Sequence, residues 1–203
     1  NFSGGEESAC VFSIAVPVFR TPAKFLCEMI ESVRSQSFPF WELCLANADP
    51  EDREVAEILE RYCREDRRIR VKNLKENKGI SENTNAALAM ARGEFVGLLD
   101  HDDLLAPDAL YEMAARLEKD GGIDVFYTDE DKVTTDLSEH FQPHLKPDFN
   151  LDLLRSNNYI CHFFVVRREI AERIGGFRPE FNGAQDYDFI FRCTEEAEKI
   201  VHI

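Results

Sequence analysis

Apolar residues in the first half of the chain fall into short continuous runs that alternate with longer amphipathic stretches. The runs lie at residues 10–18, 41–46, 69–74 and 95–99. The amphipathic stretches lie at residues 22–35, 52–64 and 81–91. Continuous apolar runs are typical of strands buried on both faces of a parallel sheet, and a period of three to four residues indicates helices. The pattern therefore predicts three strand–helix units and a fourth strand in one parallel sheet.

The second half of the chain is less regular. We expect helices at 107–119, 168–174 and 184–196, and strands at 125–127, 160–166 and 199–203. Residues 134–158 carry Pro143, Pro147 and scattered aromatic residues without a clear period. We interpret this segment as long loops that form a variable wall beside the sheet.

The fourth strand stops abruptly on a group of acids, Asp100-His101-Asp102-Asp103. Ionised carboxylates are costly to bury unpaired, whereas hard divalent cations take oxygen ligands. In open parallel sheets, ligands bind beyond the carboxyl ends of the strands. The other predicted strand ends, at residues 17–20, 47–49 and 73–79, are also polar. The sequence therefore predicts a ligand site at this edge of the sheet.

The composition of the chain excludes several classes of binding partner. The formal net charge of −15 argues against binding to nucleic acid and against electrostatic docking on an anionic membrane. The basic run 61–78 is interleaved with acids, so we interpret it as a solvated helix and strand face. No stretch approaches the roughly 20 apolar residues of a membrane span.

The six cysteines show no clustering and no metal-binding spacing, which indicates free thiols in a cytoplasmic protein. The polar residues 1–9 are expected to form a flexible leader, and residues 10–203 a single domain. Because the chain stops inside a predicted strand, we expect it to be part of a longer protein.

Seven short motifs in order along the chain resemble the family 2 glycosyltransferases, inverting nucleotide-sugar transferases with the GT-A fold. They are Ser13–Phe19, Ser35–Phe38 before Trp41–Leu43, Asn77–Ser81 with Asn85, Gly93–Val96, Leu99–Asp103, Gly175–Phe177 and Gln185–Asp188. The stretches Tyr127–Lys132 and Lys146–Asp148 look most like bacterial members that build surface polysaccharides. The resemblance implies a Rossmann-like α/β fold, with a mostly parallel sheet and helices on both faces. It also implies a nucleotide-binding half, 10–103, and an acceptor half, 104–203.

The resemblance implies that the acids after the fourth strand form a DxD motif. Asp102 would bind the cation, Mn²⁺ or Mg²⁺, that bridges the donor's two phosphates, and Asp100 would approach the ribose or the sugar. Asp103 is expected to be structural and His101 a loop spacer. Taken alone, the four residues could equally form a polar loop that caps the next helix.

The family's general base maps to Asp186, which would take the proton of the acceptor hydroxyl as that hydroxyl attacks the sugar. The usual Glu-Asp pair is Gln185-Asp186 here, so the neighbour of the base is neutral. The alternative is that Asp186 only caps its helix. Asp188 is expected to be an orienting or structural group.

The nucleotide site departs from the family pattern. The residue that often contacts the base is Ala48 here, between Asn47 and Asp49, and these two are the polar residues expected to reach the nucleotide. Pro17 and Phe19 would pack against the base, and Gly79 belongs to the same expected site. A UDP-sugar is the expected donor from family frequency, although Ala48 leaves the base open.

Other polar residues have weaker assignments. Asp129-Glu130-Asp131 is a second acidic cluster that could hold sugar or acceptor, or could be a solvated loop. The histidines His140, His144, His162 and His202 are expected to be loop or packing residues. The resemblance implies a further metal-site histidine beyond the end of this chain.

The leading hypothesis is an inverting, metal-assisted transferase that moves a sugar from a nucleotide sugar to a glycan or a lipid-linked glycan. It would work in the cytoplasm, with a possible place at the inner face of the membrane through segments outside this chain. The alternative is a non-catalytic GT-A-like binding or scaffold module, which Ala48 and Gln185 favour. A nucleotidyltransferase ranks last, because the loop after the first strand lacks a glycine-rich, basic phosphate-binding pattern.

Overall fold

The structure is a computed structural model that describes residues 10–203, and the predicted leader at 1–9 lies outside the described residues. The strands are β1 Phe12–Val18, β2 Trp41–Asn47, β3 Ile69–Asn73, β4 Phe95–Leu98, β5 Val125–Tyr127, β6 Glu130–Val133, β7 His140–His144, β8 Phe164–Arg167 and β9 Ile200–His202. The helices are α1 Ala23–Arg34, α2 Arg53–Glu65, α3 Ile80–Leu88, α4 Ala109–Lys119, α5 Leu151–Ser156, α6 Arg168–Arg173 and α7 Gln185–Glu196. A short 3₁₀ turn at Pro179–Phe181 precedes α7.

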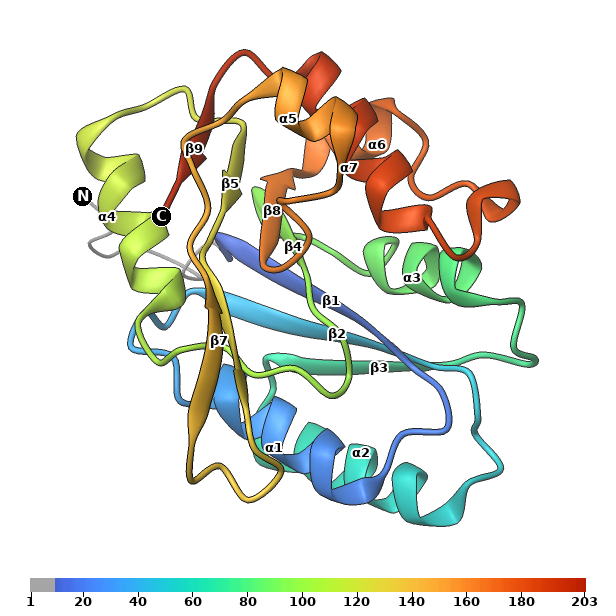
Figure 1. The fold of residues 1–203 in the computed structure, drawn as a ribbon. Helices are drawn as coiled ribbons and strands as arrows, with labels where there is room; N and C mark the ends of the chain where they lie inside the picture. The colour runs from blue at the N-terminus through green and yellow to red at the C-terminus, as the bar shows by residue number, and fades with distance from the viewer. Residues whose placement is uncertain (1–9) are drawn as a thin grey trace.

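Seven of the described strands form one sheet in the order β3-β2-β1-β4-β8-β5-β9 (Figure 1), and β6 and β7 pair separately. Strands β1 to β4 are parallel, as predicted, and helices connect each to the next. Helical crossovers return the chain to the same end of the sheet, so the carboxyl ends of these strands lie along one edge. The mostly parallel α/β sheet predicted from the sequence is confirmed.

Strand β8 runs antiparallel to both of its neighbours, β4 and β5. Its first residue, Phe164, is opposite Leu98 of β4 and Tyr127 of β5. The residues that precede β8 therefore lie at the same edge of the sheet as the carboxyl ends of β4 and β5. This reversal brings the 160–163 segment to the acidic turn after β4.

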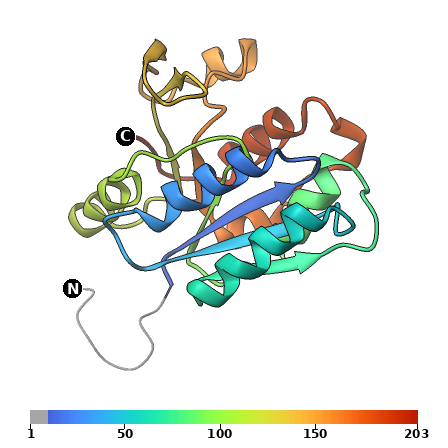
Figure 2. The same cartoon turned by 90° about the horizontal axis from the view of Figure 1, so that it is seen from below.

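Helices cover both faces of the sheet, as the first view and the view from below show together (Figures 1 and 2). On one face, α1, α2 and α4 pack against alternate residues of the strands, including Phe12, Ile14 and Val16 of β1. On the other face, α5, α6 and α7 pack against β4, β5 and β8, while α3 lies over Ala15 and Ala46. The small alanines allow α3 to lie close to the sheet.

Residues 134–158 differ from the prediction of long loops. Strands β6 and β7 form an antiparallel hairpin that projects from the sheet (Figure 2), and α5 follows it. Every residue of β7 is exposed, so the hairpin carries no alternating apolar face that a sequence pattern could reveal. The side chain of Asn150 caps α5 by accepting a hydrogen bond from the Leu153 amide at 2.9 Å.

Strand β8 begins at Phe164 rather than at residue 160 as predicted. The apolar residues Tyr159 and Ile160 are buried, which explains the strand-like pattern, but they lie in an irregular segment before the strand. All six cysteines lie within the described residues and are free thiols, as predicted.

Candidate active site

The acidic turn after β4 lies at the carboxyl edge of the sheet. The apolar strand keeps Leu98 and Leu99 buried, and the chain leaves the core at Asp100, which is half-buried. The following turn carries His101, Asp102 and Asp103. The predicted position of these acids at the end of a buried parallel strand is confirmed.

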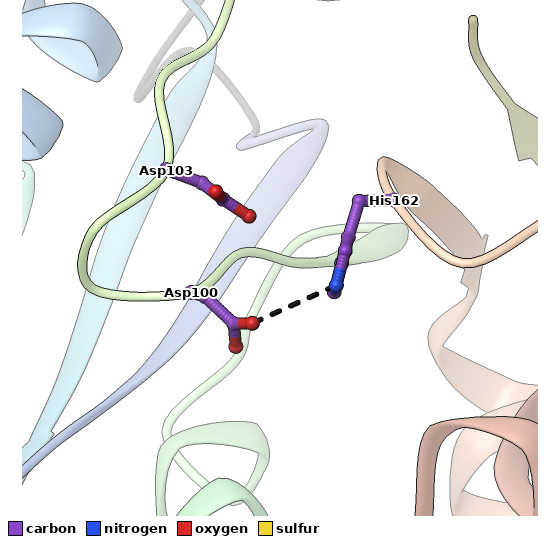
Figure 3. A group of neighbouring side chains, drawn as sticks. All are labelled: Asp100, Asp103 and His162. Atoms are coloured by element: carbon purple, nitrogen blue, oxygen red, sulfur yellow. Dashed lines mark ion pairs between the residues drawn. The ribbon is translucent and has the colours of Figure 1, made fainter. Parts of the chain in front are cut away.

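Asp100, Asp103 and His162 converge at this edge (Figure 3). Each offers one potential ligand atom, and these atoms all lie within 4.8 Å of one another. The Nε2 atom of His162 lies 3.6 Å from Oδ2 of Asp100. Two carboxylates and an imidazole are a donor set that suits Mn²⁺, and the carboxylate oxygens also suit Mg²⁺. These residues therefore fit the divalent cation that the family resemblance implies.

The negative charges gathered in the turn affect the pKa of Asp103. Burial raises the pKa of this carboxyl, and the charges of Asp100, Asp102 and Glu130 raise it further, while His162 opposes them. Carboxylates held this close together repel one another unless a cation or a proton lies among them. The turn is thus electrostatically suited to a divalent cation.

The environment of His162 favours the positively charged form of its side chain. Its interaction with the neighbouring Cys161 and the charges of Asp100 and Asp103 outweigh burial and raise the pKa of His162 to about 9. Its Nδ1 atom is buried and has no hydrogen-bond partner within the described residues. His162 was predicted to be a loop or packing residue; it does lie in the irregular segment before β8, and the structure also brings it to the acidic turn, which the prediction did not include.

Asp102, the predicted metal ligand, has an exposed side chain and is not part of the group of three. It is close enough for its charge to raise the pKa of Asp103. Its role as a ligand stays a prediction, and Asp103, which was expected to be structural, becomes a second candidate.

Asp186, the predicted base, lies in the first turn of α7. Burial raises the pKa of its carboxyl, the charge of Asp100 adds to the rise, and His162 opposes it. Asp186 therefore lies within electrostatic reach of the acidic turn, although its segment is more than 80 residues further along the chain. A raised pKa suits a carboxylate that must accept a proton.

Gln185 orients Asp186. Its Nε2 donates a hydrogen bond to Oδ2 of Asp186 at 2.9 Å, and its Oε1 accepts one from the Gly183 amide at 2.7 Å. The neutral amide thus fixes one carboxylate oxygen without adding a second charge. Asp188, expected to be an orienting or structural group, is half-buried, and its carboxylate pairs with Arg178 and Arg192.

The predicted nucleotide residues at the end of β2 are partly engaged within the protein. Asn47 is fully buried, and its Nδ2 donates to Oδ1 of Asn73 at 3.0 Å. Its own Oδ1 accepts a hydrogen bond from the Asp49 amide at 3.0 Å. Asn47 therefore shapes the turn that presents Asp49, whose side chain is half-buried. Contact of either residue with a nucleotide stays a prediction.

The remaining predicted nucleotide residues lie along the same edge of the sheet. Pro17 is buried in β1, and Phe19 follows the strand half-buried, with the Arg20 guanidinium 5.1 Å from its ring centroid. Gly79 precedes α3 with a φ of +96°, a conformation that side chains rarely adopt. A Cβ atom there would lie 2.9 Å from Nδ2 of the Asn182 side chain, which would have to shift.

The second acidic cluster has protein partners for all three of its members. Asp129 lies 2.7 Å from Nε2 of His202, Glu130 lies 3.0 Å from Nδ1 of His144, and Asp131 lies 3.0 Å from Nδ1 of His140. The ring of His202 also stacks on Tyr127, so its expected packing role is confirmed. The cluster is largely tied to the hairpin, with Glu130 close enough to influence Asp103.

His162 could not be assigned to the site from the sequence. A run of apolar residues predicts a strand but not its direction, and only the antiparallel direction of β8 brings residue 162 to Asp100. One sequence feature could have suggested that His162 lies at the site. Cys161 and His162 interrupt the apolar run between the buried residues Ile160 and Phe163.

A family model described as glycosyl transferase family 2 matches residues 13–175, which is most of the chain. The chain belongs to glycosyl transferase family 2. The resemblance inferred from the motifs is confirmed, and so is the prediction of a glycosyltransferase at the level of the family. The matched range includes Asp100, Asp102, Asp103 and His162, and ends before Asp186.

Two relatives extend over nearly the whole family 2 chain. The uncharacterized protein y4gI of Sinorhizobium fredii is 43% identical over 199 residues, which are 97% of this chain and 22% of that protein. The O-antigen biosynthesis protein RfbC of Myxococcus xanthus is 37% identical over 193 residues, which are 95% of this chain and 15% of that protein. The chain thus spans less than a quarter of the length of these relatives.

Among solved structures, residues 1–349 of TarS from S. aureus in complex with UDP align with a TM-score of 0.77. The identity is 23%, and the alignment covers 95% of this chain and 57% of that one. This likeness supports the GT-A fold predicted for the family 2 chain. Within the described residues, none of the helices has the length and apolar character needed to cross a membrane.

Proposed function

We propose that the chain is the catalytic domain of an inverting glycosyltransferase that moves a sugar from a nucleotide-sugar donor to a glycan or a lipid-linked glycan. The observation that supports this most is the meeting of Asp100, Asp103 and His162 at the carboxyl edge of β4, within electrostatic reach of Asp186. Asp100, Asp103 and His162 are suited to binding a cation, and Asp186 is suited to accepting a proton. An inverting transfer needs a base for the acceptor hydroxyl and stabilisation of the leaving diphosphate close to each other, and a cation can supply the second.

The acidic turn would hold the donor's diphosphate through a divalent cation, Mn²⁺ or Mg²⁺. Asp100, Asp103 and His162 are candidate ligands from their geometry, and Asp102 from the family pattern. A bound cation would stabilise the negative charge that grows on the nucleoside diphosphate as the sugar–oxygen bond breaks. The half-buried position of Asp100 leaves room for a ligand from the solvent side.

Asp186 would act as the general base. It would accept the proton of the acceptor hydroxyl while that oxygen attacks the anomeric carbon from the face opposite the leaving diphosphate. Gln185 would hold the carboxylate in orientation through its hydrogen bond. Asp186 lies in the first turn of α7, so the helix would fix the position of its backbone.

A UDP-sugar is the proposed donor class. TarS, whose fold this chain shares, was solved with UDP, and RfbC is named for O-antigen biosynthesis. Asp49, Phe19 and the loop before Gly79 line the same edge as the acidic turn and would surround the nucleotide. A bacterial surface polysaccharide is the proposed product class.

Titration calorimetry with UDP, in the presence and absence of Mn²⁺, tests the donor site. We expect UDP binding that strengthens at least tenfold with Mn²⁺, and loss of that enhancement in Asp100→Asn. Substituting Asp102 and Asp103 by Asn in separate variants identifies which acid on the turn contributes. Metal-independent binding, or an Asp100→Asn variant identical to wild type, would argue against the proposal.

The Asp186→Asn variant separates transfer from binding. We expect unchanged UDP affinity, and loss of sugar transfer by a factor of about 10² or more, as is typical for removal of a positioned base. Transfer is followed with the full-length protein and its glycan acceptor. Donor binding without any transfer in the wild-type protein would instead support the non-catalytic binding module.

A further inference from the structure

Lys146 carries a buried ammonium group beside the candidate active site. Its side chain is 0% exposed, and its Nζ donates hydrogen bonds to the carbonyl oxygens of Ile160, at 2.7 Å, and of His162. Oε2 of Glu130 lies 3.6 Å away. A buried charge is costly unless it is hydrogen-bonded and paired, so a surface position would be the default for lysine. Two of the three ammonium protons are used on the segment that carries His162.

The backbone of Lys146 is fixed as well. Its amide donates a 2.7 Å hydrogen bond to Oδ1 of Asp129, and that oxygen also lies 2.7 Å from Nε2 of His202. Asp129 follows β5, and His202 ends β9. Lys146 is therefore anchored to the sheet edge at one end and reaches the 160–162 segment with the other.

Ile160 is buried in the core, but few other hydrogen bonds among the described residues hold the backbone of the 160–162 segment. Apart from Lys146, the Cys161 amide donates to Oδ1 of Asn158 at 3.3 Å, and the Phe163 amide donates to Oγ1 of Thr128 at 3.3 Å. Both hydrogen bonds are long, whereas the one from Lys146 to the Ile160 carbonyl is 2.7 Å and charge-assisted. The carbonyl of His162 itself is one of the groups that Lys146 holds.

We propose that Lys146 is a positioning residue that holds the 160–162 segment so that the imidazole of His162 faces Asp100 and Asp103. This inference rests on the proposed function, because it assumes that the group of three binds the cation. Lys146 is not itself a ligand and acts on the cation site through its hydrogen bond to the backbone of His162. Its removal would let the segment relax, and the distance between His162 and Asp100 would no longer be fixed.

The test measures Mn²⁺ affinity by the electron paramagnetic resonance signal of free Mn²⁺, with UDP present, in the full-length protein. We expect Lys146→Met to weaken Mn²⁺ binding about tenfold. Lys132→Met is the matched control, because Lys132 lies in the hairpin just before Lys146 but is exposed, and among the described residues its side chain donates a hydrogen bond only to Gln142. We expect its Mn²⁺ affinity to stay within about twofold of wild type.

A double-mutant cycle distinguishes positioning from general stabilisation. If Lys146 acts through His162, Lys146→Met causes no further loss of Mn²⁺ affinity once His162→Ala is present. Additive effects of the two substitutions would overturn the inference. So would a folded Lys146→Met variant with wild-type affinity.

If Lys146→Met does not fold, Lys146→Arg provides the second variant. It keeps the charge, but a planar guanidinium cannot replace the ammonium at both carbonyls without moving the segment. We expect a several-fold loss of Mn²⁺ affinity that also disappears in the His162→Ala background, and unchanged affinity would overturn the inference. Failure of the wild-type protein to bind Mn²⁺ with UDP would instead reject the proposed function.

Discussion

The single residue that departs most informatively from the family pattern is Gln185. The family usually has a glutamate before its base, and here a neutral amide donates a hydrogen bond to Asp186. That hydrogen bond lowers the pKa of Asp186, while burial and the charge of Asp100 raise it. A carboxylate works as a base only when it is deprotonated, so, with Asp186 as the proposed base, this balance sets the acid limit of the reaction.

Changing Gln185 to Glu should move that limit. The substitution removes a hydrogen-bond donor and adds a like charge, and both changes raise the pKa of Asp186 further. Transfer, followed as kcat/KM against pH, falls as the pH drops through this pKa, so the acid limb should move to higher pH by roughly one unit. Gln185→Met, which removes only the donor, should shift it less. If Gln185→Glu leaves the acid limb of the pH profile unchanged, the group that titrates there is not Asp186.

Residues differ in how far the sequence reveals their roles. Asp100 and Asp186 could be proposed because each lies in a short motif at a predicted element end. His162 and Lys146 could not, since their roles depend on which backbone groups and side chains the fold brings next to them. A buried lysine is especially hidden, because the sequence pattern around Lys146 is that of an exposed loop.

Among the elements, the pairing of β4 with β8 decides the geometry of the site. The side of β4 at Gly97 is filled by the ring of Phe163, the residue that follows His162. A Cβ atom at position 97 would lie 2.9 Å from Cε2 of Phe163 and 3.2 Å from Cδ1 of Ile14. Gly97 therefore permits the close approach of the segment that carries His162.

The Gly97→Ala variant should be destabilised by about 1–3 kcal/mol, because overpacking a filled core displaces its neighbours. Chemical denaturation monitored by circular dichroism measures this change. Gly121→Ala is the matched control, since a Cβ atom there would meet nothing within 4 Å. Its stability should change by less than about 0.5 kcal/mol. Equal stability of the Gly97→Ala variant and wild type would mean that Phe163 does not pack as described.

Across the whole molecule, the parallel half was predictable because its buried strands and amphipathic helices differ in period and length. The later half was harder. Every residue of β7 is exposed and β6 is half-buried only at its two ends, so the hairpin lacks the apolar alternation that marks a strand. The antiparallel direction of β8 is set by tertiary packing, and no local pattern encodes it.

The position of a divalent cation with a bound nucleotide tests the proposed site for the whole molecule. Crystals of the protein soaked with Mn²⁺ and UDP would be measured for anomalous scattering of manganese. We expect an anomalous peak within coordination distance of Asp100 and of at least one further residue among Asp102, Asp103 and His162, next to the UDP phosphates. Bound UDP with manganese elsewhere, or with no manganese at the end of β4, would contradict the proposed site.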